Sequence, residues 1–206
     1  MTFLRVNIMK GGYAMIVLTS TISDISEMDK VEQYILDIAQ SGGHAALEKL
    51  YLCIKDAVFG YALSVLKNTH DAEDVLQDCC ISVYQSAHLY RSNGKPMAWI
   101  FTITRNLCLG KLRSKSRFSD RPEEDWEPYL KANERISMED KVVLEHCLRD
   151  LQEDEREILL LHIFSGMKHR EIAELTDRPL STVLSKYHRA LKKMRAIFKE
   201  EDRANG

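Results

Sequence analysis

Apolar residues recur every three or four positions through most of this chain, from about Lys30 to Ile197. That spacing is the period of an amphipathic helix, whereas a half-buried strand alternates at every second residue. Glycine and proline are scarce, with nine and four among 206 residues, and a fold rich in hairpin turns needs more of both. We therefore predict an all-α fold.

Breaks in this pattern divide the chain into parts. The segment 119–138 contains two prolines and the acidic triplet Glu123–Asp125, a composition typical of a flexible linker. We expect two small helical domains joined by this acidic linker: an N-terminal helical bundle at 29–118 and a C-terminal helix-turn-helix at 139–200. A length of 206 residues suits two such domains.

Residues 1–28 precede these domains, and we expect them to be either a disordered extension or the product of a mis-assigned start. Lys10–Gly12 can be encoded by a sequence that resembles a bacterial ribosome-binding site, and Met15 follows at a suitable distance. The alternative is that Lys-Gly-Gly is a chance linker. A peptide spanning Met9–Tyr13 in the native protein would exclude a start at Met15.

Charge is strongly segregated, although the net charge is only −2. Residues 165–199 carry nine Lys or Arg against three Asp or Glu, and residues 105–121 carry six against one. The segments 19–78 and 122–157 are acidic, with four cations against eleven acids and five against thirteen. The basic segments suit the phosphates of a nucleic acid, and solvated helix faces are the alternative explanation.

Five cysteines, an odd number, form no CxxC pair and no Cys/His spacing typical of a zinc site. We interpret them as reduced, mostly buried thiols of a cytoplasmic protein. No stretch approaches the roughly 20 apolar residues of a membrane span, and the apolar run Tyr13–Leu18 is too short for a signal peptide. We therefore expect no insertion into a membrane.

Sequence motifs for catalysis are missing. The seven His show neither HExxH nor a paired metal-ligand spacing. No Gly-rich phosphate loop and no nucleophile motif occurs. We expect no enzymatic activity, no metal and no cofactor.

A short helix, a turn of about four residues and a basic second helix follow one another at about 168–197. This order is typical of a DNA-binding helix-turn-helix, and an ordinary helical hairpin is the alternative. Ala173 is small enough for the two helices to approach, and Val183 should face the interior. Asp177 occupies a position that often needs a left-handed backbone, which Asp tolerates better than most residues.

The first half of the second helix holds the residue types that contact phosphates and base edges. The candidates are Ser181, Thr182, Ser185, Lys186, His188 and Arg189. Further along, Lys192, Lys193 and Arg195 would touch phosphates at most.

Two earlier segments have the pattern of helices with polar faces. From Asp71 to Val83, apolar residues fall on one side, and acids with an amide fall on another. We expect Thr69 or Asp71 to cap this helix. A second helix is expected from about Met97 to Arg113, and it ends in a basic run.

Three segments together resemble one protein family. Glu171–Arg195 looks like the domain of extracytoplasmic-function (ECF) sigma factors that binds the −35 promoter element. Asp71–Asp78 is similar to the helix with which these proteins dock on RNA polymerase, and Ala98–Leu107 resembles their −10 recognition helix. The motifs occur in the family's order and cover about 40–197, so the sequence resembles the ECF subgroup of the sigma-70 family.

The resemblance implies a sigma factor that directs core RNA polymerase to promoter DNA by −35 recognition and −10 melting. Core RNA polymerase and promoter DNA would be its partners, and an anti-sigma factor is a further candidate. The polymerase would be met by an acidic face made of Asp71, Asp74, Gln77 and Asp78, unless these residues only solvate an exposed helix. The −10 strand would be held by Thr102, Arg105, Asn106, Lys111, Arg113 and Lys115. Trp99 and Phe101 could stack on bases, although we expect Trp99 in the core.

The sequence departs from the family's usual pattern at several positions. Gly110 stands where Asp is usual, so we expect the helix to fray or bend there. Asp177 replaces Gly, and Lys168 replaces a Ser or Thr cap. Leu184 stands where a basic residue is common. These differences concern promoter preference more than fold.

A stand-alone helix-turn-helix regulator is the alternative function. It would explain the segment 168–195 equally well. It would not explain the acidic helix Asp71–Asp78 or the basic segment 105–121.

Overall fold

The computed structural model describes residues 5–6, 18–19, 25–115 and 149–204. Its helices form two compact units, with α1 to α4 in one and α8, α9 and most of α7 in the other. The prediction of two all-α units is therefore confirmed. A two-residue antiparallel pair, β1 (Arg5–Val6) with β2 (Leu18–Thr19), supplies the only strands in the described part of the chain. The predicted linker 119–138 lies outside these residues.

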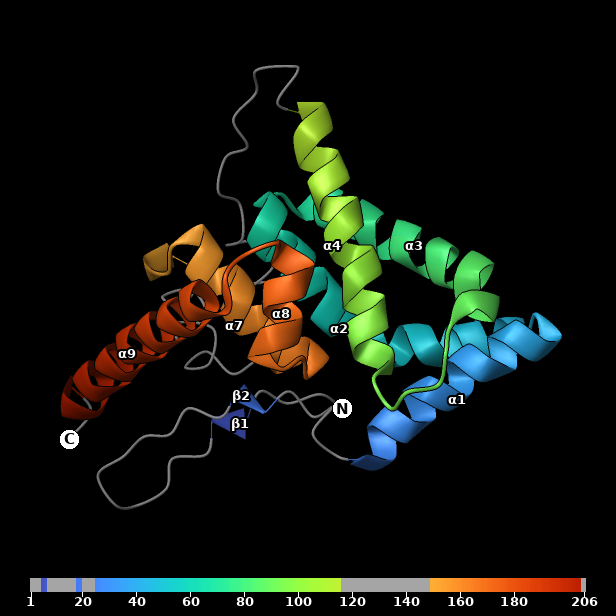
Figure 1. The fold of residues 1–206 in the computed structure, drawn as a ribbon, viewed down its shortest axis with the longest axis horizontal. Coiled ribbons are helices and arrows are strands. Elements are labelled where there is room, and N and C mark those ends of the chain that lie inside the picture. Colours follow the sequence, from blue (N-terminus) through green and yellow to red (C-terminus); the bar gives the residue numbers. More distant parts are fainter. Residues whose placement is uncertain (1–4, 7–17, 20–24, 116–148, 205–206) are drawn as a thin grey trace. The chain divides into compact units, whose positions relative to one another are not determined.

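The described part of the first unit is a bundle of helices with one short 3₁₀ turn (Figure 1). Its elements are α1 (Ile25–Ser41), α2 (His44–Leu66), α3 (Thr69–Ser86), η2 (Ala87–Leu89) and α4 (Pro96–Lys115). Helix α2 packs on α1, α3 and α4, which places it at the centre of the bundle. Helix α1 begins before the domain boundary expected at Asp29.

The core of this bundle follows the predicted helical stripes. On α1, the apolar spacing places Val31, Tyr34, Ile35 and Ile38 on one face; Val31, Ile35 and Ile38 are buried, and Tyr34 is half-buried. Tyr61 of α2 is fully buried and meets Phe101 of α4 edge to face, with 5.4 Å between the ring centroids. Apolar burial at this spacing supplies most of the helical stability, because isolated helices of this length are marginal in water.

The expected cap of helix α3 was wrong. Asn68, and not Thr69 or Asp71, is the N-cap of α3, and its Oδ1 accepts the Asp71 N–H at 3.0 Å. Asn68 takes this position because Lys67 ends α2 with a left-handed backbone, φ 55°. The chain can therefore start a new helix one residue earlier than the sequence pattern suggested.

Helix α4 is longer than the predicted 97–113. Pro96 opens it, as a residue with fixed φ and no N–H can do at the first helical position. The helix continues through Gly110, so the expected fraying at that residue does not occur. The loop before α4 is tied to α1 by Glu32, whose Oε1 accepts the hydroxyl of Tyr90 at 2.7 Å and that of Ser92 at 2.9 Å.

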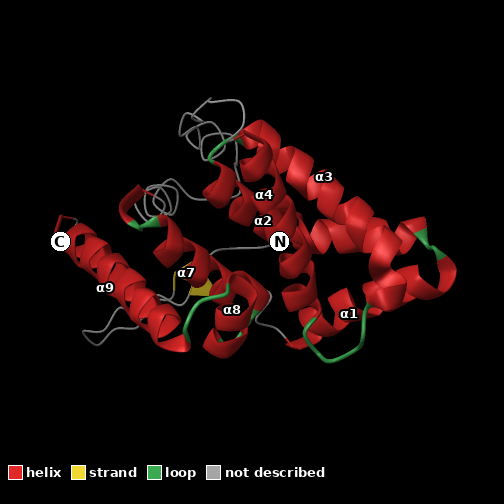
Figure 2. Ribbon diagram, turned by 45° about the horizontal axis from the view of Figure 1, so that its top comes forward, coloured by secondary structure: helices red, strands yellow, loops and turns green. Residues whose placement is uncertain are grey.

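The described part of the second unit contains α7 (Glu153–Ser165), α8 (His169–Thr176) and α9 (Leu180–Ala204). Figure 2 shows the short loop that joins α8 to α9. Leu151, Leu159, Ala190 and Met194 form a buried cluster in this unit. Residues 149–150 before α7 are also helical.

The turn between α8 and α9 has the predicted geometry. Asp177 adopts the left-handed conformation, with φ 52° and ψ 45°. The Arg178 N–H reaches the Ala173 carbonyl at 3.0 Å, which satisfies an orphan carbonyl at the end of α8. Ala173 and Val183 are buried where the two helices meet. The turn thus sets the crossing of a helix-turn-helix.

The remaining expectations concern thiols and membranes. Cys79 and Cys108 are buried, and the Cys79 Sγ lies 3.3 Å from the Thr104 Oγ1. Burial raises the pKa of Cys79 to about 12. Cys147 lies outside the described residues. Within the described ranges, no helix has the length and apolar character to cross a membrane.

Candidate nucleic-acid interface

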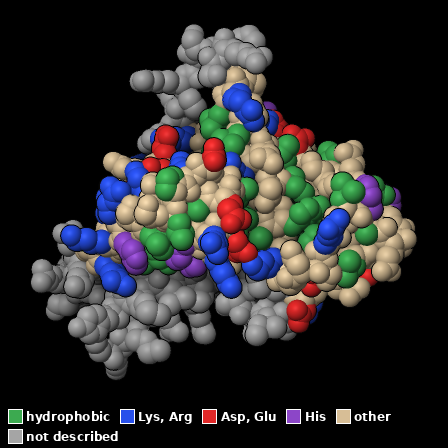
Figure 3. Space-filling view, in the orientation of Figure 1, with side chains coloured by type: hydrophobic (Ala, Val, Ile, Leu, Met, Phe, Trp, Pro, Cys, Tyr) green, Lys and Arg blue, Asp and Glu red, His purple; other side chains and the backbone are tan. Residues whose placement is uncertain are grey.

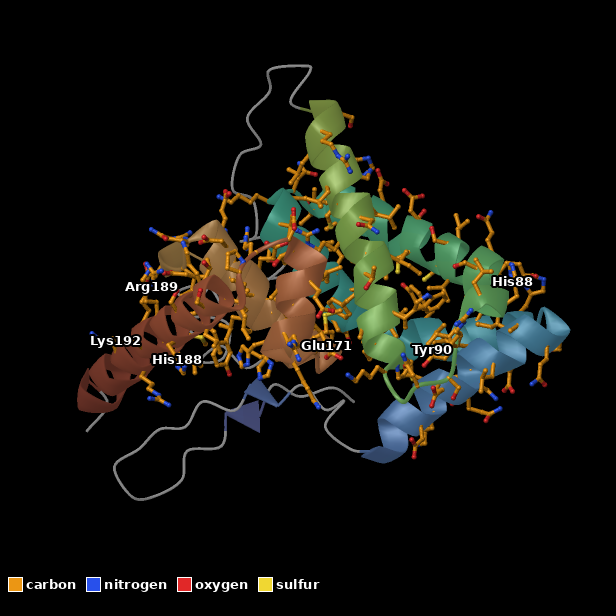
Figure 4. The ribbon with its side chains drawn as sticks, in the orientation of Figure 1. His88, Tyr90, Glu171, His188, Arg189 and Lys192 are labelled. Atoms are coloured by element: carbon orange, nitrogen blue, oxygen red, sulfur yellow. The ribbon has the colours of Figure 1, made fainter. Side chains whose placement is uncertain are left out.

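Helix α9 presents a continuous exposed face away from the core of its unit. Its members recur at helical spacing and are mainly polar or cationic: Leu180, Ser181, Leu184, Ser185, His188, Arg189, Lys192 and Arg195. We call these residues the outer face of α9. His188, Arg189 and Lys192 are labelled on this helix in Figure 4, and Lys, Arg and His side chains gather over it in Figure 3.

Four of the six candidates that the sequence suggested on α9 belong to this face, namely Ser181, Ser185, His188 and Arg189. Thr182 is half-buried beside it. Lys186 has a different position, because it is half-buried and forms an ion pair with Asp154 of α7. Burial opposes the ionisation of Asp154, but the Lys186 ammonium outweighs it, so the pKa of this carboxyl lies below its usual range.

Glu155 of α7 holds a second cation of α9. Its side chain is 1% exposed, and its Oε2 accepts Lys193 Nζ at 2.7 Å and the Gln152 N–H at 3.2 Å. The Gln152 contact is one half of a capping box at the start of α7. The Arg189 Nε lies 4.0 Å from the Glu155 Oε1. Lys193 is therefore a structural cation in this unit, which residue spacing on α9 alone did not show.

Arg178, in the turn, pairs with Glu157 at 3.2 Å. The acids of α7 thus pair with three cations of the helix-turn-helix, Arg178, Lys186 and Lys193. Lys192 and Arg195 stay exposed on the outer face of α9. Because a phosphate is attracted by exposed cations, positive charge is concentrated where a nucleic acid can reach it.

An aromatic and imidazole cluster supports the start of α8 and the middle of α9. His162 stacks on His169 with 4.7 Å between ring centroids, and Tyr187 meets His169 edge to face at 4.4 Å. Burial lowers the pKa of His169, and the neighbouring imidazoles of His162 and His188 lower it further. Among the described residues, no group of His, Cys, Asp or Glu could hold a metal ion.

On α4, part of the predicted −10 set faces outward. Asn106 and Arg113 are exposed, while Arg105 and Thr102 are half-buried. The Thr102 hydroxyl donates to the Ala98 carbonyl at 2.8 Å, so it is already used within the helix. The side chain of Lys115 is not among those described.

The two aromatic residues of α4 have different environments. Phe101 is fully buried, so the suggestion that it could stack on a base is wrong. Trp99, which we expected in the core, is only half-buried, with its ring 5.2 Å from that of Tyr90. Of these two aromatic residues, only Trp99 is therefore accessible from the surface.

Two residues that the sequence assigned to separate sites meet in the structure. Lys111 Nζ of α4 lies 2.8 Å from the Asp74 Oδ2 of α3. Its hydrogen bond lowers the pKa of Asp74. Lys111 was expected at DNA and Asp74 at the polymerase; in the structure they also link their two helices, with side chains 25% and 40% exposed. Asp71, also expected at the polymerase, is only 8% exposed at the start of α3.

The outward face of α3 contains the remaining predicted residues, Gln77 and Asp78, which are both exposed. Glu73 is exposed one turn before Gln77, and Ile81, 54% exposed, follows one turn after it. We did not select Glu73 or Ile81 from the sequence, although their four-residue spacing from Gln77 indicates the same face. Ile81 is a single apolar side chain at one end of this polar face, and single exposed apolar residues are common on protein surfaces.

These two units define a class of protein: a helical bundle with a polar and acidic face on α3, and a DNA-binding helix-turn-helix. Comparison with known protein families supports this class. The Sigma-70 region 2 family matches residues 50–118, and the Sigma-70 region 4 family matches residues 141–194.

Individual relatives narrow this class. The chain is 30% identical over 155 residues to the ECF RNA polymerase sigma factor RpoE of Cereibacter sphaeroides, covering 73% of this chain and 85% of the relative. It is 25% identical over 172 residues to the RNA polymerase sigma-H factor of Pseudomonas aeruginosa, covering 77% and 89%.

Solved structures share the fold. CnrH, solved in complex with the cytosolic domain of CnrY, aligns with a TM-score of 0.55 and 21% identity, covering 84% of this chain and 99% of that one. The sigma factor RpoE of Bartonella quintana, solved with the anti-sigma factor NepR, aligns with a TM-score of 0.55 and 20% identity, covering 74% and 96%.

The chain belongs to the ECF subgroup of the sigma-70 family. It is a non-enzymatic sigma factor that directs RNA polymerase to promoters. The match to region 2 accounts for the N-terminal helices, which the alternative of a stand-alone regulator left unexplained.

Proposed function

We propose that the outer face of α9 reads the −35 element, while α4 holds the opened −10 strand and α3 docks on core RNA polymerase. The observation that carries this assignment is the partition of cations on α9. Lys186 and Lys193 are held by acids of α7, whereas Lys192 and Arg195 remain on the exposed side with Ser181 and Ser185. Arg189 is also on this side and is 54% exposed, although its Nε lies 4.0 Å from Glu155. A helix that lies in the major groove needs this arrangement, since one side must bind its own domain.

For the −10 strand we propose Asn106 and Arg113 as the direct contacts, with Trp99 as a stacking surface. Single-strand capture combines cations for phosphates with an aromatic or polar surface for an unpaired base, and these exposed or half-buried residues provide both. Lys111 and Thr102 would then support α4 from within the bundle, as their contacts suggest.

For the polymerase we propose a surface made of Glu73, Gln77, Asp78 and Ile81. Asp74 would set the position of α3 through Lys111, and Asp71 would stabilise the start of the helix.

We keep the proposed domains of about 29–118 and 139–200, with α1 extending the first back to Ile25 and α9 extending the second to Ala204. Because the transcription machinery is its partner, we place the protein in the cytoplasm. Relatives solved with CnrY and NepR support an anti-sigma partner for this chain as well.

Each DNA contact is weak by itself, so the two domains act as a bivalent reader whose spacing core polymerase sets. The test is run-off transcription of genomic DNA by core polymerase with the full-length chain. Arg189→Ala should reduce promoter-specific transcripts and lower the salt dependence of promoter binding by about one phosphate contact. The matched control is Lys49→Ala, which removes an exposed cation from α2. If the two variants behave alike, the assignment of α9 is wrong.

A further inference from the structure

The outer face of α9 has an apolar edge. Leu180 is 42% exposed and Leu184 is 37% exposed, and they lie one turn apart at the start of the helix. Isolated exposed leucines are common on protein surfaces and need no explanation. These two differ because they are neighbours on the helical turns that carry Ser181, Ser185 and His188.

The structure also shows which side of the outer face the leucines occupy. At about 100° per residue, Leu180 and Leu184 fall on the flank that continues into Leu191, which packs on the core. The opposite flank leads to Lys186 and Lys193, which are bound to α7. A groove that receives α9 would therefore meet leucine methyl groups on one edge and hydroxyl, imidazole and guanidinium groups beside them.

The edges of the base pairs offer one apolar group in the major groove, the C5 methyl of thymine. Leucine side chains cannot hydrogen-bond to a base, so a contact with this methyl is the sequence-specific interaction available to them. We propose that Leu180 and Leu184 contact thymine methyl groups and make the −35 element selective for thymine. This inference rests on the proposed role of α9, and it names the chemistry that one edge of that helix reads.

The energetic scale is that of burying one methyl group between apolar atoms. Removing such a group changes affinity by about fourfold. The effect should be confined to one or two base pairs, because two side chains one turn apart span only about 6 Å of helix axis. At other thymines in the element, loss of the methyl should change nothing.

The experiment uses holoenzyme assembled from core RNA polymerase and the full-length chain, on a promoter found by run-off transcription. Each thymine of the −35 element, on either strand, is replaced singly by deoxyuridine, which removes the C5 methyl and keeps the pairing edge. The affinity for each duplex is measured by competition. At one or two positions we expect wild-type holoenzyme to bind about fourfold more weakly.

Leu184→Ala and Leu180→Ala then decide which side chain is responsible. Each should weaken binding to the thymine duplex and erase the difference between thymine and deoxyuridine at its own position. Leu89→Ala is the matched control, since Leu89 is 65% exposed on the other unit, and it should retain the full difference. An intact thymine preference in both α9 variants would overturn the inference.

Failure of this inference can be told apart from failure of the proposed function. If no deoxyuridine substitution matters, or the element has no A·T pair, while Arg189→Ala still weakens promoter binding, then only the leucine contact is wrong. If neither Arg189→Ala nor replacement of the −35 DNA changes binding, α9 does not read this element. A partner protein that needs Leu184 while DNA affinity is unchanged would also contradict the thymine contact.

Discussion

Lys193→Met tests whether a cation of the recognition helix serves the fold and not DNA. The substitution keeps a long unbranched side chain and removes the ammonium that lies 2.7 Å from the Glu155 carboxylate. Glu155 is 1% exposed, so its charge would be left buried, with the Gln152 N–H at 3.2 Å and the Arg189 Nε at 4.0 Å as its remaining partners.

The expected loss of stability depends on how deeply each partner of this ion pair is buried. Removing one partner of a buried ion pair costs about 3–5 kcal/mol, because the other charge stays uncompensated. The Lys193 side chain is 38% exposed, so water can reach the vacated position, and we expect a loss of about 2 kcal/mol. A small domain would then lose roughly 8–16 °C in Tm.

Thermal unfolding of the full-length chain by calorimetry measures this loss, with hydrogen exchange assigning the transition to α7 and α9. Lys192→Met is the matched control, because Lys192 is an exposed neighbour on the outer face, and it should change stability by less than about 0.5 kcal/mol. Glu155→Gln should cost less than Lys193→Met, since the freed ammonium can turn to water.

The double variant Lys193→Met with Glu155→Gln supplies the decisive comparison. It should be more stable than the sum of the single losses predicts, because the buried charge and its partner disappear together. Equal losses for Lys193→Met and Lys192→Met, or strictly additive losses in the double variant, would refute the argument.

Other predictions concern the remaining surfaces and one titrating group. Gln77→Ala combined with Asp78→Ala should reduce capture of core polymerase at least tenfold with unchanged helical circular dichroism; normal capture would show that this face of α3 is not the docking surface. Burial and two neighbouring imidazoles lower the pKa of His169 in the folded state, so the unfolded chain binds more protons below about pH 6.5. The contribution of His169 to the stability of the second unit should therefore be full above that pH and should fall as the pH drops toward the lower folded-state pKa. His169→Gln should flatten this dependence. If the free energy of unfolding, measured in urea, changes between pH 7 and pH 5 by the same amount in this variant and in the wild type, the prediction is contradicted. Gly110→Ala should raise the stability of the first unit by about 0.5–1 kcal/mol, because a Cβ at this position meets no atom within 4 Å; a lower Tm would show that the position is constrained.

Local chemistry is what the sequence determined. The helical spacing of apolar residues predicted the buried face of α1, and the positions of Ala173, Asp177 and Val183 predicted the crossing of α8 and α9. These features depend on residues within one or two turns of each other, where the 3.6-residue period and the steric limits on φ and ψ leave few choices.

Only the tertiary structure decided which charges are available. Lys186 and Lys192 have the same residue type and lie on the same helix, yet one is bound to Asp154 and the other is exposed. The pairing of Lys111 with Asp74 across two helices was equally hidden in the sequence. Such contacts depend on how helices distant in sequence pack, because Coulomb attraction becomes specific only when packing brings two side chains within a few ångströms.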